Sequence, residues 1–322
     1  MKTVKTTPAT PEAITHAAAI IRSGGLVAFP TETVYGLGAN ALDPIAVARI
    51  FEAKNRPFFD PLIVHVANVG ALDELVMGVD ARAVALAAAF WPGPLTIVFP
   101  KQAVVPDIVT AGLSTVAIRL PAHPVARALI DEAHVPIAAP SANPFNYISP
   151  TRAAHVAAQL GGRVDMILDG GDCMVGVEST IVECAGPGTR ILRHGGLPLE
   201  EIERVIGPLR DATVHRDAPI APGQLPAHYS PRTRLAIVRD AHHPPAVSDA
   251  ALLAFRTPPR SLRYAAVEVL SPSGDLREAA ANLFSALHRL DEAGVAIIYA
   301  EAVPEEGLGR AIMDRLRRAA AK

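Results

Sequence analysis

Residues 24–38 read GGLVAFPTETVYGLG, and this stretch decides the fold class. Its two glycines end a helix that a Thr-Pro pair begins at residues 10–11, with threonine as the cap and proline in the first turn. The short apolar run at 26–29 predicts a buried β-strand. Polar residues follow at 30–38, where α/β sheets place their ligands. Helix, strand and polar loop in this order predict an α/β protein.

Helix and strand patterns alternate in the same way as far as residue 206. Further strands are expected at 62–66, 95–99, 116–120, 136–139, 164–168, 180–183 and 190–193, and further helices at 43–53, at 81–90 and from 150 onward. The pattern lapses over residues 207–234, which contain five prolines. It resumes with strands at 235–238, 252–255, 266–270 and 295–300 and helices at 276–291 and 307–320.

This organisation predicts two domains. Residues 1–206 should form a twisted mixed sheet covered by helices, and residues 235–322 a small, doubly wound, Rossmann-like α/β unit. A structureless loop of nearly thirty residues is unusual inside one domain, so we expect residues 207–234 to be a proline-rich linker.

Composition excludes several classes of protein. The 322 residues carry 30 Lys+Arg and 32 Asp+Glu, a net charge of −2, and half of them are hydrophobic. This balance excludes a disordered chain and a broadly basic nucleic-acid-binding protein. The apolar run at residues 83–91 is too short for a membrane span, which needs about 18 residues. Cys173 and Cys184 are expected to be ordinary buried side chains. Together these features favour a cytoplasmic protein.

Several common motifs are missing from the sequence. There is no Walker-type phosphate loop and no G-x-S-x-G nucleophile elbow. Residues 36–41, GLGANA, fit a dinucleotide-binding pattern, but they lie six residues beyond the end of the first strand. A dinucleotide fingerprint requires the glycines immediately after the strand, so we do not interpret these residues as one.

Polar and cationic residues instead cluster at the ends of strands that are expected to be buried. The segments are 30–38, 54–65, 114–121, 137–151, 177–180 and 191–196. Each has an ordinary structural explanation: a turn, a solvated helix end, or a core histidine in the case of His65. Arg119 ends an apolar strand, so it needs either an acidic side chain or a ligand anion beside it.

Taken together, these segments describe one cavity. It would contain Lys54, Arg56, Arg119 and Arg193, several hydroxyls and small residues, but no activated nucleophile. Such a cavity suits a polyanion next to a small zwitterion.

Eight motifs in register identify a family resemblance over residues 10–205. They are PTETVYGLG (30–38), KNRP (54–57), PLIVH (61–65), WPGPLT (91–96), RLP (119–121), APSAN (139–143), EST (178–180) and LRHG (192–195). The segment closely resembles the YrdC-like domain of threonylcarbamoyl-AMP synthases. The remainder resembles the longer, two-domain form, whose linker element is here PG at 222–223, HY at 228–229 and Pro231.

The resemblance implies an L-threonylcarbamoyladenylate synthase, a nucleotidyltransferase that uses L-threonine, bicarbonate and ATP and releases pyrophosphate. A carbamate of threonine would itself attack the α-phosphorus, so no covalent catalytic residue is needed. The product would serve N6-threonylcarbamoyladenosine modification at position 37 of tRNA, through a separate transferase complex. Magnesium is expected with ATP and with few protein ligands, no membrane partner is expected, and a transient contact with tRNA is left open.

The resemblance also implies roles for single residues. Threonine contacts are expected from Thr33, His65, Arg119, Ala139 and Ser179. ATP contacts are expected from Lys54, Arg56, Asp60, Thr115, Ser141, Asn143, Ser149, Arg193 and Tyr229. Because Tyr229 lies in the linker, the linker is expected to fold over the cavity as a lid. Family linkers often carry Lys or Arg before the His-Tyr pair, whereas this chain has QLPA at 224–227.

Two alternatives remain at this stage. The same basic cavity could belong to an RNA-binding or ribosome-associated module, although residues 1–200 carry 14 Lys+Arg against 17 Asp+Glu and so offer no broad basic face. Carbamoyl transfer from carbamoyl phosphate is the other, although the extra modules typical of such enzymes are missing. Arg310, Arg315, Arg317 and Arg318 are interpreted as a solvated helix face, with a contact to a partner or RNA as the alternative.

Overall fold

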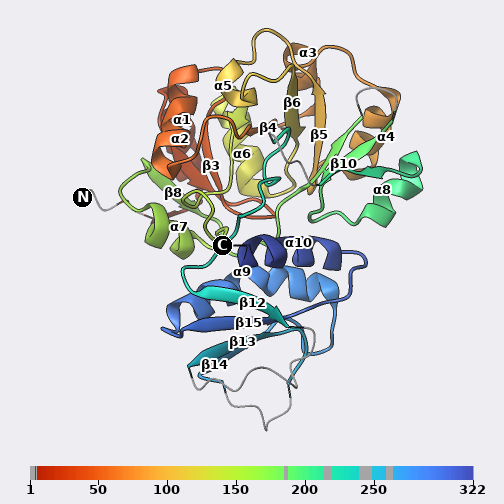
Figure 1. The fold of residues 1–322 in the computed structure, drawn as a ribbon. Coiled ribbons are helices and arrows are strands. Elements are labelled where there is room, and N and C mark those ends of the chain that lie inside the picture. Colours follow the sequence, from red (N-terminus) through yellow and green to blue (C-terminus); the bar gives the residue numbers. More distant parts are fainter. Residues whose placement is uncertain are drawn as a thin grey trace.

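The computed structural model describes residues 4, 6–184, 188–213, 219–238, 249–258 and 264–321. In these residues the strands form two sheets, a large mixed one and a small parallel one (Figure 1). The large sheet has the order β1-β8-β2-β3-β7-β4-β6-β5-β9-β10-β11, and the small one the order β12-β15-β13-β14. The expected fold class is confirmed.

The elements of the large sheet and its helices have the following bounds. The strands are β1 (Thr6–Pro8), β2 (Val27–Phe29), β3 (Gly36–Asn40), β4 (Ile63–His65), β5 (Leu95–Pro100), β6 (Thr115–Arg119), β7 (Ile137–Ala138), β8 (Met166–Asp169), β9 (Thr180–Glu183), β10 (Arg190–Arg193) and β11 (Arg210–Asp211). The helices are α1 (Pro11–Arg22), α2 (Pro44–Lys54), η1 (Val69–Ala71), α3 (Leu72–Leu75), α4 (Ala81–Phe90), α5 (Asp107–Thr110), α6 (Pro124–Ala133), α7 (Ala153–Leu160) and α8 (Leu199–Ile206).

The turn offered as one explanation of the segment 30–38 does not include its two glycines. Residues 36–40 form β3, which pairs antiparallel with β2 so that Gly38 lies opposite Val27. A side chain at Gly38 would place its Cβ 2.7 Å from Cε1 of Phe29 and 2.8 Å from Cγ2 of Ile137. The glycine is therefore needed for close packing inside the sheet, which is a role that the motif comparison did not consider.

Helices cover the two faces of the large sheet unequally. On one face, α2, α4 and α7 pack over a long apolar cluster. On the other face, α1 and α6 cover the strands from β8 to β7. Helix α6 was not predicted from the sequence. It begins at the proline of a His-Pro pair, with His123 as its N-cap, and buries residues at the helical spacing 126, 129, 130 and 133.

On the rest of that face, the strands from β4 to β10 are covered differently. Residues Ile63, Val98, Ala117, Ile181 and Leu192 of β4, β5, β6, β9 and β10 form an apolar cluster there together with Ala221. Ala221 belongs to residues 207–234, the expected linker. This segment therefore packs onto the sheet, and it also adds strand β11 at the edge, parallel to β10.

The second sheet contains β12 (Arg234–Val238), β13 (Ala250–Ala254), β14 (Ala266–Val269) and β15 (Ile297–Glu301), all parallel. Its helices α9 (Leu276–Glu292) and α10 (Gly309–Ala320) share one apolar cluster with the sheet residues Ala251, Leu253 and Ile298. The neighbouring residues Leu252 and Tyr299 point to the other face. Both described helices thus lie on one face, so the expected doubly wound arrangement is not seen in the described residues.

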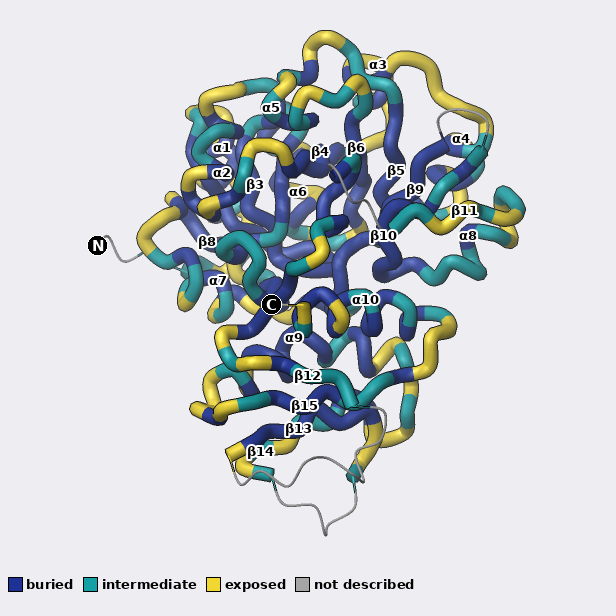
Figure 2. Tube along the Cα trace, viewed as in Figure 1, coloured by how far each residue is buried: buried dark blue, intermediate teal, exposed yellow. Residues whose placement is uncertain are grey.

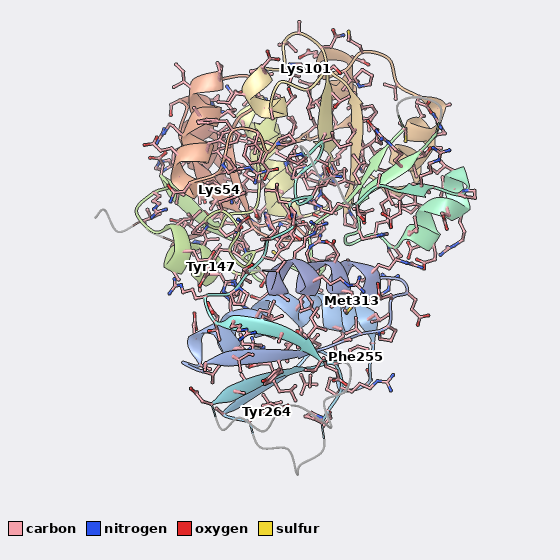
Figure 3. The ribbon with its side chains drawn as sticks, viewed as in Figure 1. Lys54, Lys101, Tyr147, Phe255, Tyr264 and Met313 are labelled. Carbon is pink, nitrogen blue, oxygen red and sulfur yellow. The ribbon has the colours of Figure 1, made fainter. Side chains whose placement is uncertain are left out.

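That helical face also meets the large domain. The same cluster contains Val34, Ile148 and Val177 of the large domain and Tyr229 of the connecting segment. Figure 2 shows α9 and α10, which carry many buried positions, between the large domain and the small sheet. Tyr147, labelled near this junction in Figure 3, donates a 2.6 Å hydrogen bond to Asp291 of α9.

The two cysteines and the helix lengths can also be compared with the predictions. Cys173 and Cys184 are both buried and unbridged, as predicted. Among the described residues, we find no helix with the length and apolar character that a membrane span requires.

The packing at Gly38 leads to a prediction for stability. We expect Gly38→Ala to lower the free energy of unfolding by about 1–3 kcal/mol, because the added methyl group overpacks the contact with Phe29 and Ile137. Urea unfolding followed by the fluorescence of Trp91, the single tryptophan, measures this effect. Gly188→Ala is the control, since a Cβ there meets nothing within 4 Å and should change stability by less than about 0.5 kcal/mol. Equal effects at the two positions would contradict the prediction.

Candidate active site

A cavity lies on the half of the sheet face that no helix covers. It encloses about 540 Å3 when the space open to solvent is included. Its wall contains nine of the residues expected from the sequence: Thr33, Arg56, His65, Arg119, Ala139, Ser141, Ser179, Arg193 and Tyr229. The other five, Lys54, Asp60, Thr115, Asn143 and Ser149, are not among its lining residues.

Strand register places the groups expected to bind threonine. His65 ends β4 and lies directly opposite Arg119, which ends the parallel strand β6. The guanidinium of Arg119 donates a 2.9 Å hydrogen bond from Nη1 to the hydroxyl of Thr33, and its Nη2 lies 2.7 Å from the carboxylate of Glu32. Burial raises the pKa of Glu32, but Arg119 outweighs this effect and the net pKa is lowered.

The question of the anionic partner of Arg119 is thus answered. An acidic side chain, Glu32, neutralises it from behind, while Arg119 still lines the cavity. Its Nε also donates to the carbonyl oxygen of Gly93 at 3.3 Å. Three protein partners therefore fix the guanidinium in one orientation before any ligand arrives, which is the preorganisation that carboxylate recognition requires.

His65 is buried, and its Nδ1 has no hydrogen-bond partner among the described residues. Burial and the nearby positive charge of Arg119 lower the pKa of His65 to about 3. The side chain is therefore neutral at physiological pH and can offer a ring nitrogen to a ligand. The ordinary explanation of His65 as a fully satisfied core residue does not hold, because a buried polar atom without a partner is costly.

Ser179 connects the two halves of the cavity. Its hydroxyl lies 2.7 Å from that of Thr96, and it accepts a 3.1 Å hydrogen bond from Nη2 of Arg193. Arg193 also donates two hydrogen bonds to the Ser179 carbonyl oxygen, at 2.9 and 3.1 Å, and one to that of Pro222 at 3.1 Å. Burial lowers the pKa of Arg193.

Arg56 lines the cavity, whereas Asp60 lies behind it. Nη2 of Arg56 is 2.9 Å from Oδ1 of Asp60 and donates to the Pro61 carbonyl at 2.8 Å. Asp60 is fully buried, and burial raises its pKa against the opposing effect of Arg56. Asp60 therefore holds the arginine in place instead of facing the cavity.

Lys54 and Asn143 also act from behind the wall. The ammonium of Lys54, inside the large domain in Figure 3, donates to the carbonyl oxygens of Ser141 and Asn143. The Asn143 amide donates to the carbonyls of Pro144 and Tyr147 at 2.8 and 2.9 Å. Both side chains shape the loop that presents Ser141. Burial, followed by the charge of Arg56, lowers the pKa of Lys54 well below its usual value.

Two further expected residues lie away from the cavity wall. Ser149 is buried and donates a 2.5 Å hydrogen bond to Oε1 of Glu178, which does line the cavity. Thr115 begins β6, four residues before Arg119, and pairs with Pro100 in the sheet.

The connecting segment closes one side of the cavity. Pro222, Gly223, His228 and Tyr229 all line it. Gln224, which stands where family linkers often carry a cation, is buried and ties the segment down: its amide nitrogen donates to the carbonyls of Leu192 and Ala212, and its oxygen accepts from two backbone amides of the segment. Its role here is therefore structural.

The interpretation of the last helix as a solvated basic face was wrong for two of its arginines. Arg315 is completely buried, and Arg318 is 8% exposed. Arg315 pairs with Glu178 of the large domain at 2.8 Å, and its guanidinium carbon lies 4.8 Å from the centre of the Tyr229 ring. The sequence did carry a signal, because Arg315 occupies a position of the apolar stripe 311, 312, 315, 316 and 319.

Other site residues were missed as well. Glu32, Thr96, Glu178 and His228 appeared only inside motifs or the linker, with no role assigned. His228 is buried, and burial and the charge of Arg56 keep its pKa well below the usual value. Among the described residues, no group of three or more His, Cys, Asp or Glu side chains is arranged to hold a metal ion.

A mixed sheet with a preorganised, arginine-lined cavity and a second parallel-sheet domain define a two-domain α/β protein with a site suited to anionic ligands. Comparisons with known proteins identify the family. The family described as Telomere recombination (Sua5, YciO and YrdC) matches residues 19–195, and the family described as Threonylcarbamoyl-AMP synthase, C-terminal domain, matches residues 197–321.

Individual relatives are similar in sequence over almost the whole length of this chain. The threonylcarbamoyl-AMP synthase of Pyrococcus abyssi is 47% identical over 94% of this chain and 92% of its own. The threonylcarbamoyl-AMP synthase of Bacillus subtilis is 44% identical over 95% of this chain and 92% of its own. The crystal structure of P. abyssi Sua5 complexed with L-threonine superposes with a TM-score of 0.90 at 44% identity, covering 97% of this chain and 95% of that one.

The chain belongs to the threonylcarbamoyl-AMP synthase family. It is therefore an enzyme of the nucleotidyltransferase type, and the resemblance drawn from the eight motifs is confirmed. Membership of an enzyme family decides against an RNA-binding module as its principal function.

The lowered pKa of His65 leads to a prediction about pH. The unfolded chain binds a proton at His65 below about pH 6.5, whereas the folded chain does so only near pH 3, so stability falls as the pH falls between these values. When the pH falls from 7 to 5, the free energy of unfolding of His65→Asn should therefore decrease by about 2 kcal/mol less than that of the wild type. Urea unfolding followed by Trp91 fluorescence measures the difference. The exposed His16→Asn is the control and should follow the wild type; parallel curves for all three proteins would refute the prediction.

Proposed function

We propose that this chain forms L-threonylcarbamoyl-AMP and pyrophosphate from L-threonine, bicarbonate and ATP. The observation that carries the proposal is the composition of the cavity wall. Arg119 and His65 lie on one part of it and Arg56 and Arg193 on another, all held by protein partners, and the lining residues include no Cys or Lys that could serve as a nucleophile.

The groups around Arg119 suit an amino acid. The guanidinium would take the carboxylate of threonine, and the neutral ring of His65 and the hydroxyls of Thr33 and Ser179 would receive its polar groups. Arg56, Arg193, Ser141 and Tyr229 would receive the nucleotide. Lys54, Asp60, Asn143 and Ser149 would act indirectly, by fixing these groups, and for Thr115 we propose no direct contact.

The reaction then needs placement more than covalent help. Bicarbonate takes up a proton and loses water to give CO2, which combines with the amino group of threonine; the nitrogen then loses a proton to give a carbamate. A carbamate oxygen attacks the α-phosphorus of ATP, and the bond between that phosphorus and the bridging oxygen of pyrophosphate breaks. Arginines fixed in advance stabilise the charge that develops on the phosphoryl oxygens.

Magnesium enters this scheme as part of the substrate. Among the described residues, Glu178 is the one acidic residue of the lining, and its two oxygens accept hydrogen bonds from Ser149 and Arg315. The donor set therefore fits an ion carried on the phosphates of ATP and not one held by the protein.

The product would pass to a separate transferase complex that modifies adenosine 37 of tRNA. We infer a cytoplasmic location from that tRNA substrate, and we leave direct contact with tRNA open. We also propose that the chain divides into a catalytic domain of residues 1–206, a covering segment of residues 207–234 and a C-terminal domain of residues 235–322. The large sheet, the covering segment and the small sheet correspond closely to these ranges.

The first test concerns the substrates and the arginines. Pyrophosphate release should require both threonine and bicarbonate, and Arg56→Ala and Arg119→Ala should each reduce it at least about 100-fold, because each removes a fixed charge from the reacting groups. Arg49→Ala is the control, since Arg49 pairs with Asp165 in a half-exposed position outside the cavity. Trp91 fluorescence verifies folding. Equal ATP cleavage without threonine would refute the assignment of the substrate.

The second test concerns the covering segment. Gly223 has φ +84°, and a Cβ there would lie 2.7 Å from the hydroxyl of Tyr229 and 3.0 Å from Cδ of Arg193. We expect Gly223→Ala to push the segment off the cavity and to reduce threonine-dependent pyrophosphate release about tenfold or more. Gly207→Ala is the matched control, because Gly207 also has positive φ (+79°) but an open surrounding. Equal losses in the two variants would show that backbone strain alone is responsible.

A further inference from the structure

Arg315 joins the small domain to the cavity through a buried ion pair. It lies on α10, is 0% exposed, and reaches the carboxylate of Glu178 through Nε at 2.8 Å. Glu178 belongs to the loop before β9 and lines the cavity. An arginine buried this completely is rare unless its partners are well placed.

Glu178 depends on this contact to stay ionised. The side chain is buried, and burial alone would raise its pKa; the charge of Arg315, then that of Arg193 and the hydrogen bond from Ser149, lower it instead. Its oxygens are divided between Ser149 and Arg315. Its backbone carbonyl accepts from Gly196 at 2.8 Å, in the loop that follows Arg193. Glu178 is thus an anchor between the floor of the cavity and α10.

Arg315 also touches the covering segment. Its guanidinium lies over the ring of Tyr229, at 4.8 Å from the ring centre, in the range of a cation–π contact. The ring of Phe284 of α9 also stacks against that of Tyr229, with ring centres 5.7 Å apart. Tyr229 is therefore held by two residues of the small domain.

We propose that Arg315 is a positioning residue through which the small domain keeps the cavity in its reactive geometry. It acts through the ionised carboxylate of Glu178 and through the ring of Tyr229, and it does not touch the substrates. This inference rests on the proposed function, because its principal readout is the rate of that reaction. The inference gives the C-terminal domain a role in the reaction, which is to hold Glu178 and Tyr229 in place at the cavity.

Three variants of the full-length chain test the proposal. Arg315→Met removes the charge but keeps an apolar side chain in the stripe, and it should lower kcat for pyrophosphate release about 100-fold. Most of that loss would come from the buried, uncompensated charge of Glu178. The double variant with Glu178→Gln removes that charge and should therefore recover at least about tenfold of the rate.

Arg310→Met is the matched control. Arg310 also lies on α10 and also pairs with a glutamate of the large domain, Glu200, but this pair is partly exposed and neither residue is among the lining residues of the cavity. The control should keep kcat within about twofold of the wild type. Melting temperatures of all variants verify that the compared proteins are folded.

Three results would overturn the proposal: a rate for Arg315→Met close to that of the wild type, an equal loss in Arg310→Met, or no recovery in the double variant. If the wild type releases no threonine-dependent pyrophosphate, the proposed function fails instead. The melting temperatures would then still decide whether Arg315 and Glu178 are coupled, since the double variant should melt above Arg315→Met.

Discussion

The structure depends on keeping several arginines buried around one cavity, each with a partner. A buried guanidinium is tolerated only when its hydrogen bonds and charge are compensated. Arg119 has Glu32, Arg56 has Asp60, and Arg315 has Glu178. Arg193 has carbonyl oxygens and the Ser179 hydroxyl instead. Glu32 and Asp60 are not among the lining residues, and Glu178, which does line the cavity, is paired with Arg315, so the wall keeps the cationic groups Arg56, Arg119 and Arg193.

This arrangement explains why the chain needs more than its large sheet. Helices α1 and α6 cover only part of one sheet face, and the remaining strands would otherwise expose apolar and cationic groups to water. The segment after residue 207 covers them, and α9 and α10 hold that segment in place. The covering segment, the cavity wall and the second domain therefore pack against one another, and a change in any of them affects the site.

Much of the architecture was predictable from local patterns. Helix α4 and strands β9 and β10 have the predicted bounds, because alternating apolar residues and Pro-Gly punctuation mark them clearly. The eight motifs identified the family, which the comparisons confirm. The errors have physical causes as well. Gly36 and Gly38 suggested a loop, whereas the sheet needs small residues there for close packing against Phe29 and Ala139.

The sequence by itself determined the α/β class, the family, and which residue types line the cavity, since strand ends and motif spacing depend on local order along the chain. Only the tertiary structure decided which polar residues face the cavity and which stand behind it. Lys54, Arg56 and Asp60 lie in the same segment, 54–65, yet Asp60 pairs with Arg56 behind the wall and Lys54 donates to carbonyl oxygens 87 and 89 residues away. Arg315 lies 137 residues beyond Glu178, and no local pattern can pair charges across that separation.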